Sequence, residues 1–344
     1  RFNEKILSRF QIYNSLFLTL PFKAIKQTSL LMPLFSEHCR NQYEINNNPH
    51  DIVNSFFNLY APDFDSEQQL DLLFNFIQYI ERQVVLFDAI EDAGFSYVNN
   101  MHGRGTLRNM KEEASNKQLG DALSEYIKRF KVRIVLTAHP TQFYPDNVLV
   151  IMNELSKAIS EDDLDSVKKL LVQLGKTPFY KKEKPSPYDE AISLIWFLEN
   201  IFYHSASTIY NYVAEHIVDS KDLNNPIFDF GFWPGGDRDG NPFVTPEITI
   251  KTAKRLKFSI LRNYYRDLRK LKRKITFPGV EDRVEKLENM VFNELFYPER
   301  NKNFSLEYLS SELEFVLNKV EDEHDGLYKD EVLDIIYKVR LFGL

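Results

Sequence analysis

The residues best suited to chemistry are concentrated in one stretch, GFWPGGDRDGNPFVT at 231–245. Four of the twelve glycines fall within Gly231–Gly240, around the charged triplet Asp237-Arg238-Asp239. Glycine permits positive φ and close approach of the backbone to a ligand, so this concentration indicates a local requirement. Arg238 and nearby backbone N–H groups could bind a phosphate or carboxylate. The simpler alternative is a tight turn held by Asp–Arg hydrogen bonds.

A second candidate is His139, in the segment TAHPT at 137–141. The preceding run, KVRIVL, is short, apolar and rich in β-branched residues, which is typical of a buried parallel strand. Histidine titrates near neutrality, so His139 could act as a general base or bind phosphate. The alternative is a turn histidine that hydrogen-bonds backbone carbonyls.

The elements that must position both candidates are two strands, expected near 132–138 and 227–233. Each ends in polar residues and is followed by helical sequence. In parallel α/β sheets and barrels, ligands bind at the carboxyl ends of the strands, so we expect His139 and the Asp237–Asp239 triplet to lie at such positions. Asp237 and Asp239 could also bind a cation, but no third carboxylate lies close in sequence, so we predict no metal ligands here.

The rest of the chain reads as helices, most clearly residues 1–130. In the segment from residue 66 to 95, Ser66 and Gln69 have the spacing of a capping box, and Gly94 is placed to end the helix. One apolar stripe is predicted to face the core. It consists of Leu70, Leu73, Phe74, Ile77, Ile80, Val84 and Phe87.

A long helix is predicted from Thr245, as N-cap, and Pro246 to about residue 275. Its part at 251–274 contains eleven basic residues and one acidic residue. A solvated or inter-subunit face is the simpler interpretation, and binding of RNA or a protein partner is the alternative.

Composition narrows the class of protein. The chain has 344 residues, 43% of them hydrophobic, which supports a large packed core. The net charge of −7 argues against nucleic-acid binding by the whole protein. Cys39 is the single cysteine, and the sequence shows no signal peptide and no apolar run of membrane-spanning length, so we expect a cytoplasmic protein without membrane contact. The motifs GxSxG, GxGxxG and the P-loop are absent from the sequence.

The two motifs in this order resemble phosphoenolpyruvate carboxylase. That family carries a TAHPT segment, a KPT..DEA segment similar to KPSPYDEA at 184–191, and a GGDRDGNP.VT segment. The resemblance runs from about residue 132 to the end. The family usually continues HPTE with an arginine pair, whereas Gln142, Phe143 and Tyr144 follow here.

The resemblance implies a mainly α fold that is the N-terminal part of an α-rich (β/α)₈ TIM barrel. Residues 1–131 would form an N-terminal helical region, and 132–344 would hold the opening strands with long helical insertions. Family members are much longer, so we expect the barrel to be incomplete and this fragment to be inactive by itself.

The implied reaction is anaplerotic carbon dioxide fixation by a lyase, in which phosphoenolpyruvate and bicarbonate give oxaloacetate and phosphate with Mg²⁺ or Mn²⁺. His139 would deprotonate carboxyphosphate or hold it, and Arg238 would supply positive potential or brace its loop. The metal ligands are expected in a C-terminal half that this chain lacks, and the full-length enzyme is expected to be a homotetramer. Further residues expected to bind substrate or brace the loop are Thr141, Gly235, Gly236, Asp237, Asp239 and Asn241.

Overall fold

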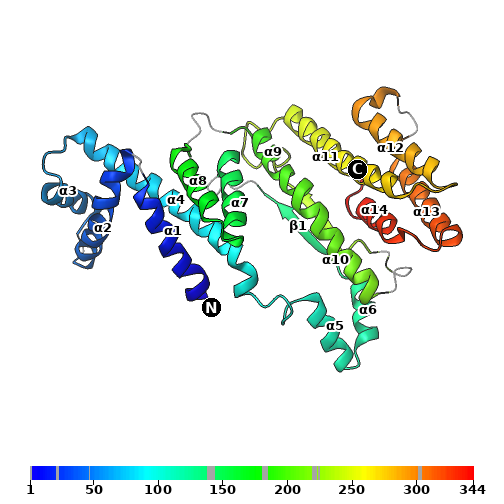
Figure 1. Cartoon of the computed structure of the whole chain (residues 1–344). Helices are drawn as coiled ribbons and strands as arrows, with labels where there is room; N and C mark the ends of the chain where they lie inside the picture. Colours follow the sequence, from blue (N-terminus) through cyan, green and yellow to red (C-terminus); the bar gives the residue numbers. More distant parts are fainter. Residues whose placement is uncertain are drawn as a thin grey trace. The chain divides into compact units, whose positions relative to one another are not determined.

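The structure is a computed structural model dominated by helices (Figure 1), which confirms the mainly helical class expected from the sequence. It describes residues 2–20, 23–45, 47–137, 144–179, 185–218, 223, 225–300 and 304–344. The chain divides into two compact units. The first combines Arg1–Met101 with Gln142–Lys182, and the second combines His102–Thr141 with Glu183–Leu344.

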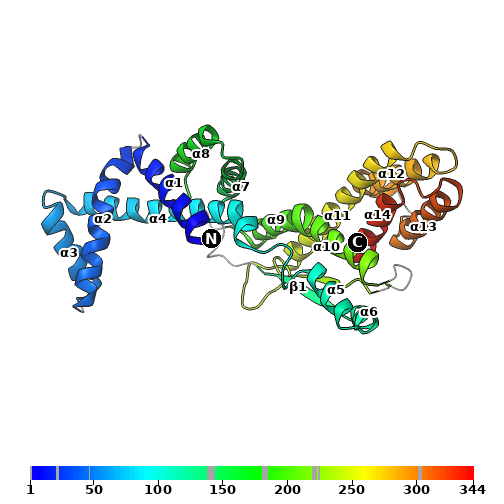
Figure 2. The same cartoon turned by 60° about the horizontal axis from the view of Figure 1, so that its bottom comes forward.

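The first unit is built around one long helix, α4 (Ser66–Val98), with α7 and α8 beside it (Figure 2). Its main core joins α4 to α1 and α7, where Phe17, Leu86 and Ile151 are fully or almost fully buried. A smaller aromatic core joins α2, α3 and α4. The other elements of this unit are η1 (Asn3–Leu7), α1 (Ser8–Thr19), α2 (Lys23–Glu44), α3 (Pro49–Tyr60), α7 (Asp146–Ser160) and α8 (Leu164–Lys176).

The ends of α4 differ from the sequence prediction. Asp65 is the N-cap and forms a capping box with Gln68, one residue before the predicted pair Ser66 and Gln69. The helix continues through Gly94 to Val98. A Cβ on Gly94 would lie 2.2 Å from Ile6 Cδ1, so this glycine permits close packing and does not end the helix.

The apolar stripe that was predicted to face the core is largely exposed. Its exposed members are Leu70, Phe74, Ile77, Ile80 and Val84, each 45–67% accessible to solvent. The buried face instead contains Leu72, Phe76, Tyr79, Val85, Leu86 and Ile90. The prediction was wrong because α4 is apolar on two faces, and periodicity cannot tell which of them the neighbouring helices cover.

The second unit contains both strands and a set of packed helices (Figure 1), with Tyr203, Tyr264 and Leu268 fully buried in its core. Here α11 packs on α12, α13 packs on α14, and α14 also contacts α10 and α11. The elements are α5 (Leu107–Asn116), α6 (Gly120–Ile127), β1 (Val132–Leu136), α9 (Pro187–Phe197), η2 (Leu198–Phe202), α10 (Tyr203–His216), β2 (Phe228–Phe232), α11 (Pro246–Lys274), α12 (Glu281–Phe296), η3 (Pro298–Arg300), α13 (Leu306–Glu323) and α14 (Lys329–Phe342).

The two strands lie within the predicted ranges 132–138 and 227–233 and pair in parallel. The register runs from Val132 opposite Phe228 to Leu136 opposite Phe232. Burial is lower than predicted, since Val135 is 40% exposed and the residues of β2 are only partly buried. Within the described residues the sheet has these two strands alone, so the barrel implied by the family stays a prediction.

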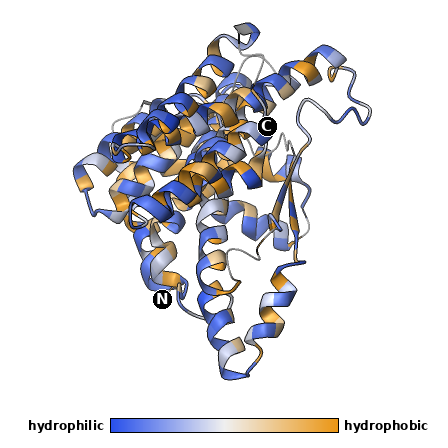
Figure 3. Ribbon diagram, turned by 90° about the vertical axis from the view of Figure 1, so that its right-hand side faces the viewer, coloured by the Kyte–Doolittle hydropathy of each residue, from blue (hydrophilic) through white to orange (hydrophobic). Residues whose placement is uncertain are grey.

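The expected boundary between residues 131 and 132 falls inside the second unit, which begins at His102 and holds α5 and α6 before β1. The segment Gln142–Lys182 belongs instead to the first unit, because α7 packs against α4. The helices mix polar and apolar residues (Figure 3), and no described helix combines the length and apolar character needed to cross a membrane.

Candidate active site at the strand ends

The carboxyl ends of β1 and β2 lie side by side. Leu136 and Phe232 are paired at the last position of the register, and the Trp233 N–H donates a 2.9 Å hydrogen bond to the Leu136 carbonyl. Both predicted motifs therefore begin at the same edge of the sheet. His139 and Thr141 follow β1 by three and five residues and lie outside the described residues.

The segment after β2 is held at both ends and exposed between them. Pro234 and Gly235 are buried directly after Trp233, and Val244 is buried before Thr245, which caps the first turn of α11. The residues between these anchors, 236–243, are all exposed. We call residues 236–243 the arginine loop, because Arg238 is its only basic residue.

Two of the predicted site glycines have different roles. Gly235 has φ of +73°, a backbone conformation that favours glycine, and a Cβ there would lie 2.3 Å from Thr252 Oγ1. Gly236 has no positive φ, and the nearest atom to a Cβ would be the Trp233 carbonyl oxygen at 3.5 Å. Glycine is therefore required at Gly235 but not by the local geometry at Gly236. Gly240, with φ of +70°, completes the turn.

The charged triplet is held by backbone contacts. The N–H groups of Gly236 and Asp237 donate to the Trp233 carbonyl at 2.8 and 2.9 Å, and the Asn241 N–H donates to the Arg238 carbonyl at 2.7 Å. Asp237 accepts a 3.2 Å hydrogen bond from the Asp239 N–H. Arg238 forms no ion pair with any described residue, so the Asp–Arg network of the simpler alternative is not found there. The Glu247 backbone N–H and the Thr245 hydroxyl lower the pKa of Glu247, and the charge of Arg238 adds to this lowering, so the exposed guanidinium has a carboxylate nearby.

The described part of the chain contains no complete set of metal-ligating side chains. No group of three or more His, Cys, Asp or Glu side chains lies close enough there to hold a metal ion. Asp237 and Asp239 supply two carboxylates on an exposed loop, and one of these already accepts a backbone hydrogen bond. Mg²⁺ usually takes one or two carboxylates from a protein and completes its shell with water and substrate phosphate, so these two side chains alone do not define a metal site.

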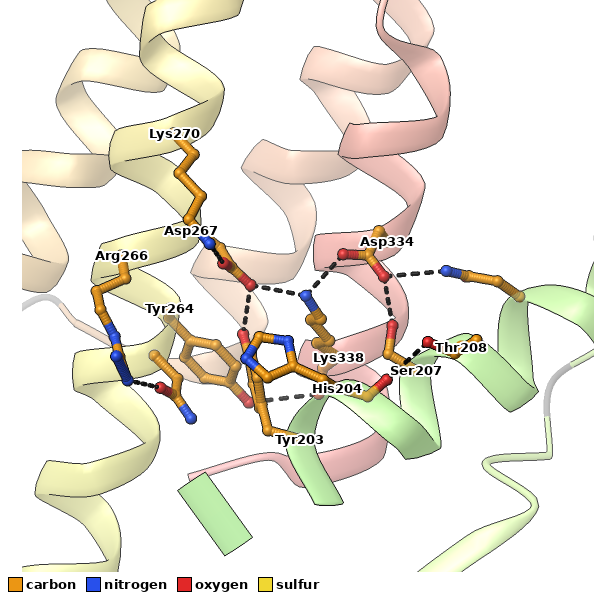
Figure 4. Close-up of polar contacts among 12 residues, drawn as sticks. Tyr203, His204, Ser207, Thr208, Tyr264, Arg266, Asp267, Lys270, Asp334 and Lys338 are labelled. Carbon is orange, nitrogen blue, oxygen red and sulfur yellow. Dashed lines mark hydrogen bonds and ion pairs between the residues drawn. The ribbon is translucent and has the colours of Figure 1, made fainter. Parts of the chain in front are cut away.

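Sequence reasoning missed a buried charge network between α10, α11 and α14 (Figure 4). Lys338 of α14 is 5% exposed, and its Nζ lies 2.8 Å from Asp267 Oδ2 and 2.7 Å from Asp334 Oδ2. Tyr203 donates to Asp267 Oδ2 at 3.0 Å, which ties α10 to α11 and α14. Burial would raise the pKa of Asp334, but Lys338 and hydrogen-bond donors outweigh it and lower that pKa. These positions read as ordinary helical residues in sequence.

His204 lies beside this network (Figure 4) and lines a pocket of about 620 Å³ with Lys270 and Lys338. Burial lowers the pKa of His204, and the Lys338 charge lowers it further, while Asp267 and Asp334 act in the opposite direction. The imidazole is therefore neutral at physiological pH. The pocket contains basic and acidic side chains in similar numbers, so it has no strong preference for an anion.

The basic face of α11 is largely neutralised within the second unit. Arg262 and Arg266 both bind Glu199, a buried carboxylate in the π-helical turn η2. Further ion pairs with neighbouring helices or along α11 join Lys257 to Glu294, Lys270 to Asp267, Lys272 to Glu285 and Glu288, and Lys274 to Glu331. At least six of the eleven basic residues are thus paired, which leaves less positive potential than the sequence suggests.

Tyr144, one of the three residues that follow TAHPT in this chain, is used for packing. Its hydroxyl donates to Asp88 Oδ2 of α4 at 3.1 Å, and its ring contacts Phe179 edge to face. Burial raises the pKa of Tyr144 to about 12, and the Asp88 carboxylate adds to the rise. The side chain is neutral and held within the first unit, so it cannot replace an arginine as a cation.

Comparison with known proteins gives one family. The profile of the family described as "Phosphoenolpyruvate carboxylase" matches residues 72–325. A phosphoenolpyruvate carboxylase of Vibrio vulnificus (strain YJ016) is 28% identical over 180 residues, covering 48% of this chain and 20% of that protein. Similar proteins with the same name occur in Rhodothermus marinus, 27% identical over 179 residues (46% and 19%), and Proteus mirabilis (strain HI4320), 30% identical over 151 residues (39% and 17%). The chain spans about a fifth of the length of these relatives.

Proposed function

Because the chain belongs to the phosphoenolpyruvate carboxylase family, we propose that it supplies two substrate-facing loops of an enzyme that carboxylates phosphoenolpyruvate. The observation that supports this proposal is the parallel pair β1 and β2, whose carboxyl ends lie side by side, so that the two motif segments begin at one edge of the sheet. Active sites of parallel β/α enzymes lie at this edge. The chain belongs to a lyase family, and the strand ends are the place where such an enzyme would bind its substrate.

The reaction requires charge neutralisation and exclusion of water. Bicarbonate oxygen attacks the phosphorus of phosphoenolpyruvate, the bond from phosphorus to the enol oxygen breaks, and carboxyphosphate and the enolate of pyruvate form. Carboxyphosphate then releases carbon dioxide and phosphate, and the enolate carbon attacks carbon dioxide to give oxaloacetate. A site open to water would protonate the enolate to pyruvate, so the loops must close it off.

We assign the two motif residues different parts of this sequence. His139 would accept the proton of carboxyphosphate as carbon dioxide departs, as a base of near-neutral pKa can. Arg238 would contribute positive potential to the phosphoryl group, which its exposed position supports. Thr141, Asp237, Asp239 and Asn241 would shape the two loops around the substrate.

The fold proposed for the whole enzyme is the family's (β/α)₈ barrel, with β1 and β2 as its opening strands. Partial exposure of both strands supports this, because parallel strands are normally covered on both faces. The family is generally metal-dependent. A required Mg²⁺ or Mn²⁺ would take its ligands from outside the described residues, where it would supply electrostatic stabilisation of the enolate. The homotetramer and the cytoplasmic location stay predictions.

The alternative, a non-catalytic module that binds RNA or a partner through 251–274, gains little support. Ion pairs within the second unit occupy at least six of the eleven basic residues of that helix. Retention of nucleic acid near physiological ionic strength, falling steeply with added salt, would favour it. We expect no such binding.

The proposed function is tested by coupling oxaloacetate formation to malate dehydrogenase, with phosphoenolpyruvate and bicarbonate as substrates. The full-length protein that contains this chain should produce oxaloacetate only when both substrates and a divalent cation are present. The 344-residue chain by itself should give none, because it spans about a fifth of the length of its relatives. Metal-dependent turnover by the isolated chain would contradict this division of the active site.

A further inference from the structure

A buried threonine packs directly beneath the arginine loop. Thr252, in the second turn of α11, is 3% exposed, and its Oγ1 has no hydrogen-bond partner among the described residues. Helical threonines commonly bond the carbonyl four residues earlier, as Thr249 does with Thr245 at 3.2 Å. An unpartnered buried hydroxyl costs free energy, so something else must account for threonine at this position.

The contact between Thr252 and Gly235 explains why threonine occupies this position. A Cβ built on Gly235 would meet three atoms of the threonine side chain: Oγ1 at 2.3 Å, Cβ at 3.1 Å and Cγ2 at 3.3 Å. The backbone of Gly235 therefore lies on the branched end of Thr252. Gly235 also has φ of +73°, so the position excludes other residues on two independent grounds.

This contact lies at the point where the arginine loop begins. Pro234 and Gly235 are the buried residues directly before the loop, and all residues from Gly236 to Phe243 are exposed. The loop has its other fixed end at Val244 and the Thr245 N-cap of the same helix. Both ends of the loop are thus held against the first two turns of α11.

We propose that Thr252 is a positioning residue for Arg238. The shape of its β-branched side chain, and not its hydroxyl, fixes Gly235 and thereby sets where the arginine loop leaves the sheet. The expected effect of Thr252 on catalysis rests on the proposed function. The packing contact between Thr252 and Gly235 does not depend on that function. Displacement of a positioned group by about 1 Å can lower a rate by on the order of 100-fold.

The first test uses fluorescence of Trp233, which directly precedes Pro234. The chain has two tryptophans, so Trp196→Phe leaves Trp233 as the single reporter. Thr252→Val keeps the branched shape and should leave the emission maximum and iodide quenching of Trp233 unchanged. Thr252→Ala removes the contact and should change the quenching constant by about twofold or more. Equal spectra for Ala and Val would overturn the proposal.

The second test separates the contact from backbone strain by a double-mutant cycle. Gly240 has nearly the same φ as Gly235, +70°, but nothing lies within 4 Å of a Cβ built there. Gly235→Ala should lower the urea midpoint more than Gly240→Ala. Thr252→Ala should recover part of the loss in the Gly235→Ala variant and none in the Gly240→Ala variant. Recovery in both, or in neither, would contradict direct packing.

The catalytic consequence is measured in the full-length protein. At an assay temperature well below the melting temperature of the variant, Thr252→Ala should lower kcat/KM for oxaloacetate formation about tenfold or more. It should also raise the ratio of pyruvate to oxaloacetate. Thr252→Val should retain the wild-type product ratio, which a general loss of packing would not explain. Wild-type rate and product ratio in Thr252→Ala would refute a positioning role. If the wild-type protein makes no oxaloacetate, the proposed function fails, and the fluorescence and urea tests still decide whether Thr252 sets the loop.

Discussion

Replacing Lys338 with methionine should destabilise the second unit strongly. The Lys338 side chain is 6% exposed, and it neutralises two carboxylates, Asp267 at 2.8 Å and Asp334 at 2.7 Å. Methionine has similar length and no charge, so Lys338→Met removes the cation with little change in volume. Asp267 and Asp334 would then share a poorly solvated site without their common partner (Figure 4).

The expected magnitude follows from the burial of the two carboxylates. Removing one partner of a buried ion pair typically costs about 3–5 kcal/mol. The Asp267 side chain is 9% exposed and should bear most of this cost, whereas Asp334 is 31% exposed and accepts a hydrogen bond from Asn211 at 3.0 Å. We therefore expect a loss of about 3–4 kcal/mol in the free energy of unfolding, a large part of the ~5–15 kcal/mol typical of a domain.

The assay is urea unfolding followed by tryptophan fluorescence. Both tryptophans, Trp196 and Trp233, lie in the second unit, so the signal reports that unit. The matched control is Lys270→Met, because Lys270 also contacts Asp267, at 3.5 Å, but its side chain is 70% exposed. The control should cost less than about 1 kcal/mol. Equal losses for Lys338→Met and Lys270→Met would refute the reasoning.

The pH dependence gives an independent check. In the folded wild type the pKa of Asp334 is lowered, so its contribution to stability is present above the unfolded pKa of about 3.9 and is lost as pH falls through the lower folded value. Without Lys338, the effect of burial on Asp334 is no longer offset by that cation, so the pKa of Asp334 rises relative to the wild type and acid protonates it more readily in the folded state. The deficit of Lys338→Met should therefore narrow between pH 7 and pH 4.

Three further predictions concern packing and titration. Phe76→Ala should lower the free energy of unfolding of the first unit by about 3–5 kcal/mol. Its neighbour Ile77 is 50% exposed, so Ile77→Ser should lower that free energy by less than about 1 kcal/mol. Equal shifts of the two variants in circular dichroism melts would contradict the observed face of α4. Gly94→Ala should lower the free energy of unfolding by about 1 kcal/mol, because the new Cβ would lie 2.2 Å from Ile6 Cδ1 and this clash outweighs the better helix propensity of alanine. A gain in melting temperature would show that Ile6 moves aside. The pKa of His204 in the folded protein is below its unfolded value near 6.5, so the contribution of His204 to stability decreases as pH falls below about 6.5. His204→Gln should therefore make the urea midpoint depend less on pH between pH 7 and 5. An unchanged pH dependence of the midpoint would contradict this.

The sequence predicted well what depends on local signals. Thr245 and Pro246 located the start of α11, and the short β-branched run before TAHPT located β1. Turn chemistry pointed to the loop after β2, although Gly235, not Gly236, is the glycine that the geometry requires. In each case the determining interactions lie within a few residues, so the pattern contains them.

What the sequence could not predict depends on long-range partners. The core face of α4 is chosen by α1, α2 and α7, so two apolar faces left the choice open. Thr252 faces Gly235, 17 positions earlier in the sequence, and Lys338 meets Asp267 across 71 positions. Neither position has an unusual residue type or spacing. Similarly, the charge of the basic helix was overestimated because its acidic partners, such as Glu199 and Glu294, come from other elements.

The central claim, that this chain supplies the base for the carboxyphosphate step, is tested most directly by the products of His139→Asn in the full-length enzyme. With phosphoenolpyruvate and bicarbonate, the variant should still release phosphate and pyruvate, because phosphoryl transfer precedes the step that needs the base. Oxaloacetate should fall by roughly 100-fold or more, the range expected for loss of a placed acid–base group. A parallel fall of pyruvate and oxaloacetate would instead indicate a role in binding phosphoenolpyruvate. A wild-type yield of oxaloacetate would remove His139 from the mechanism.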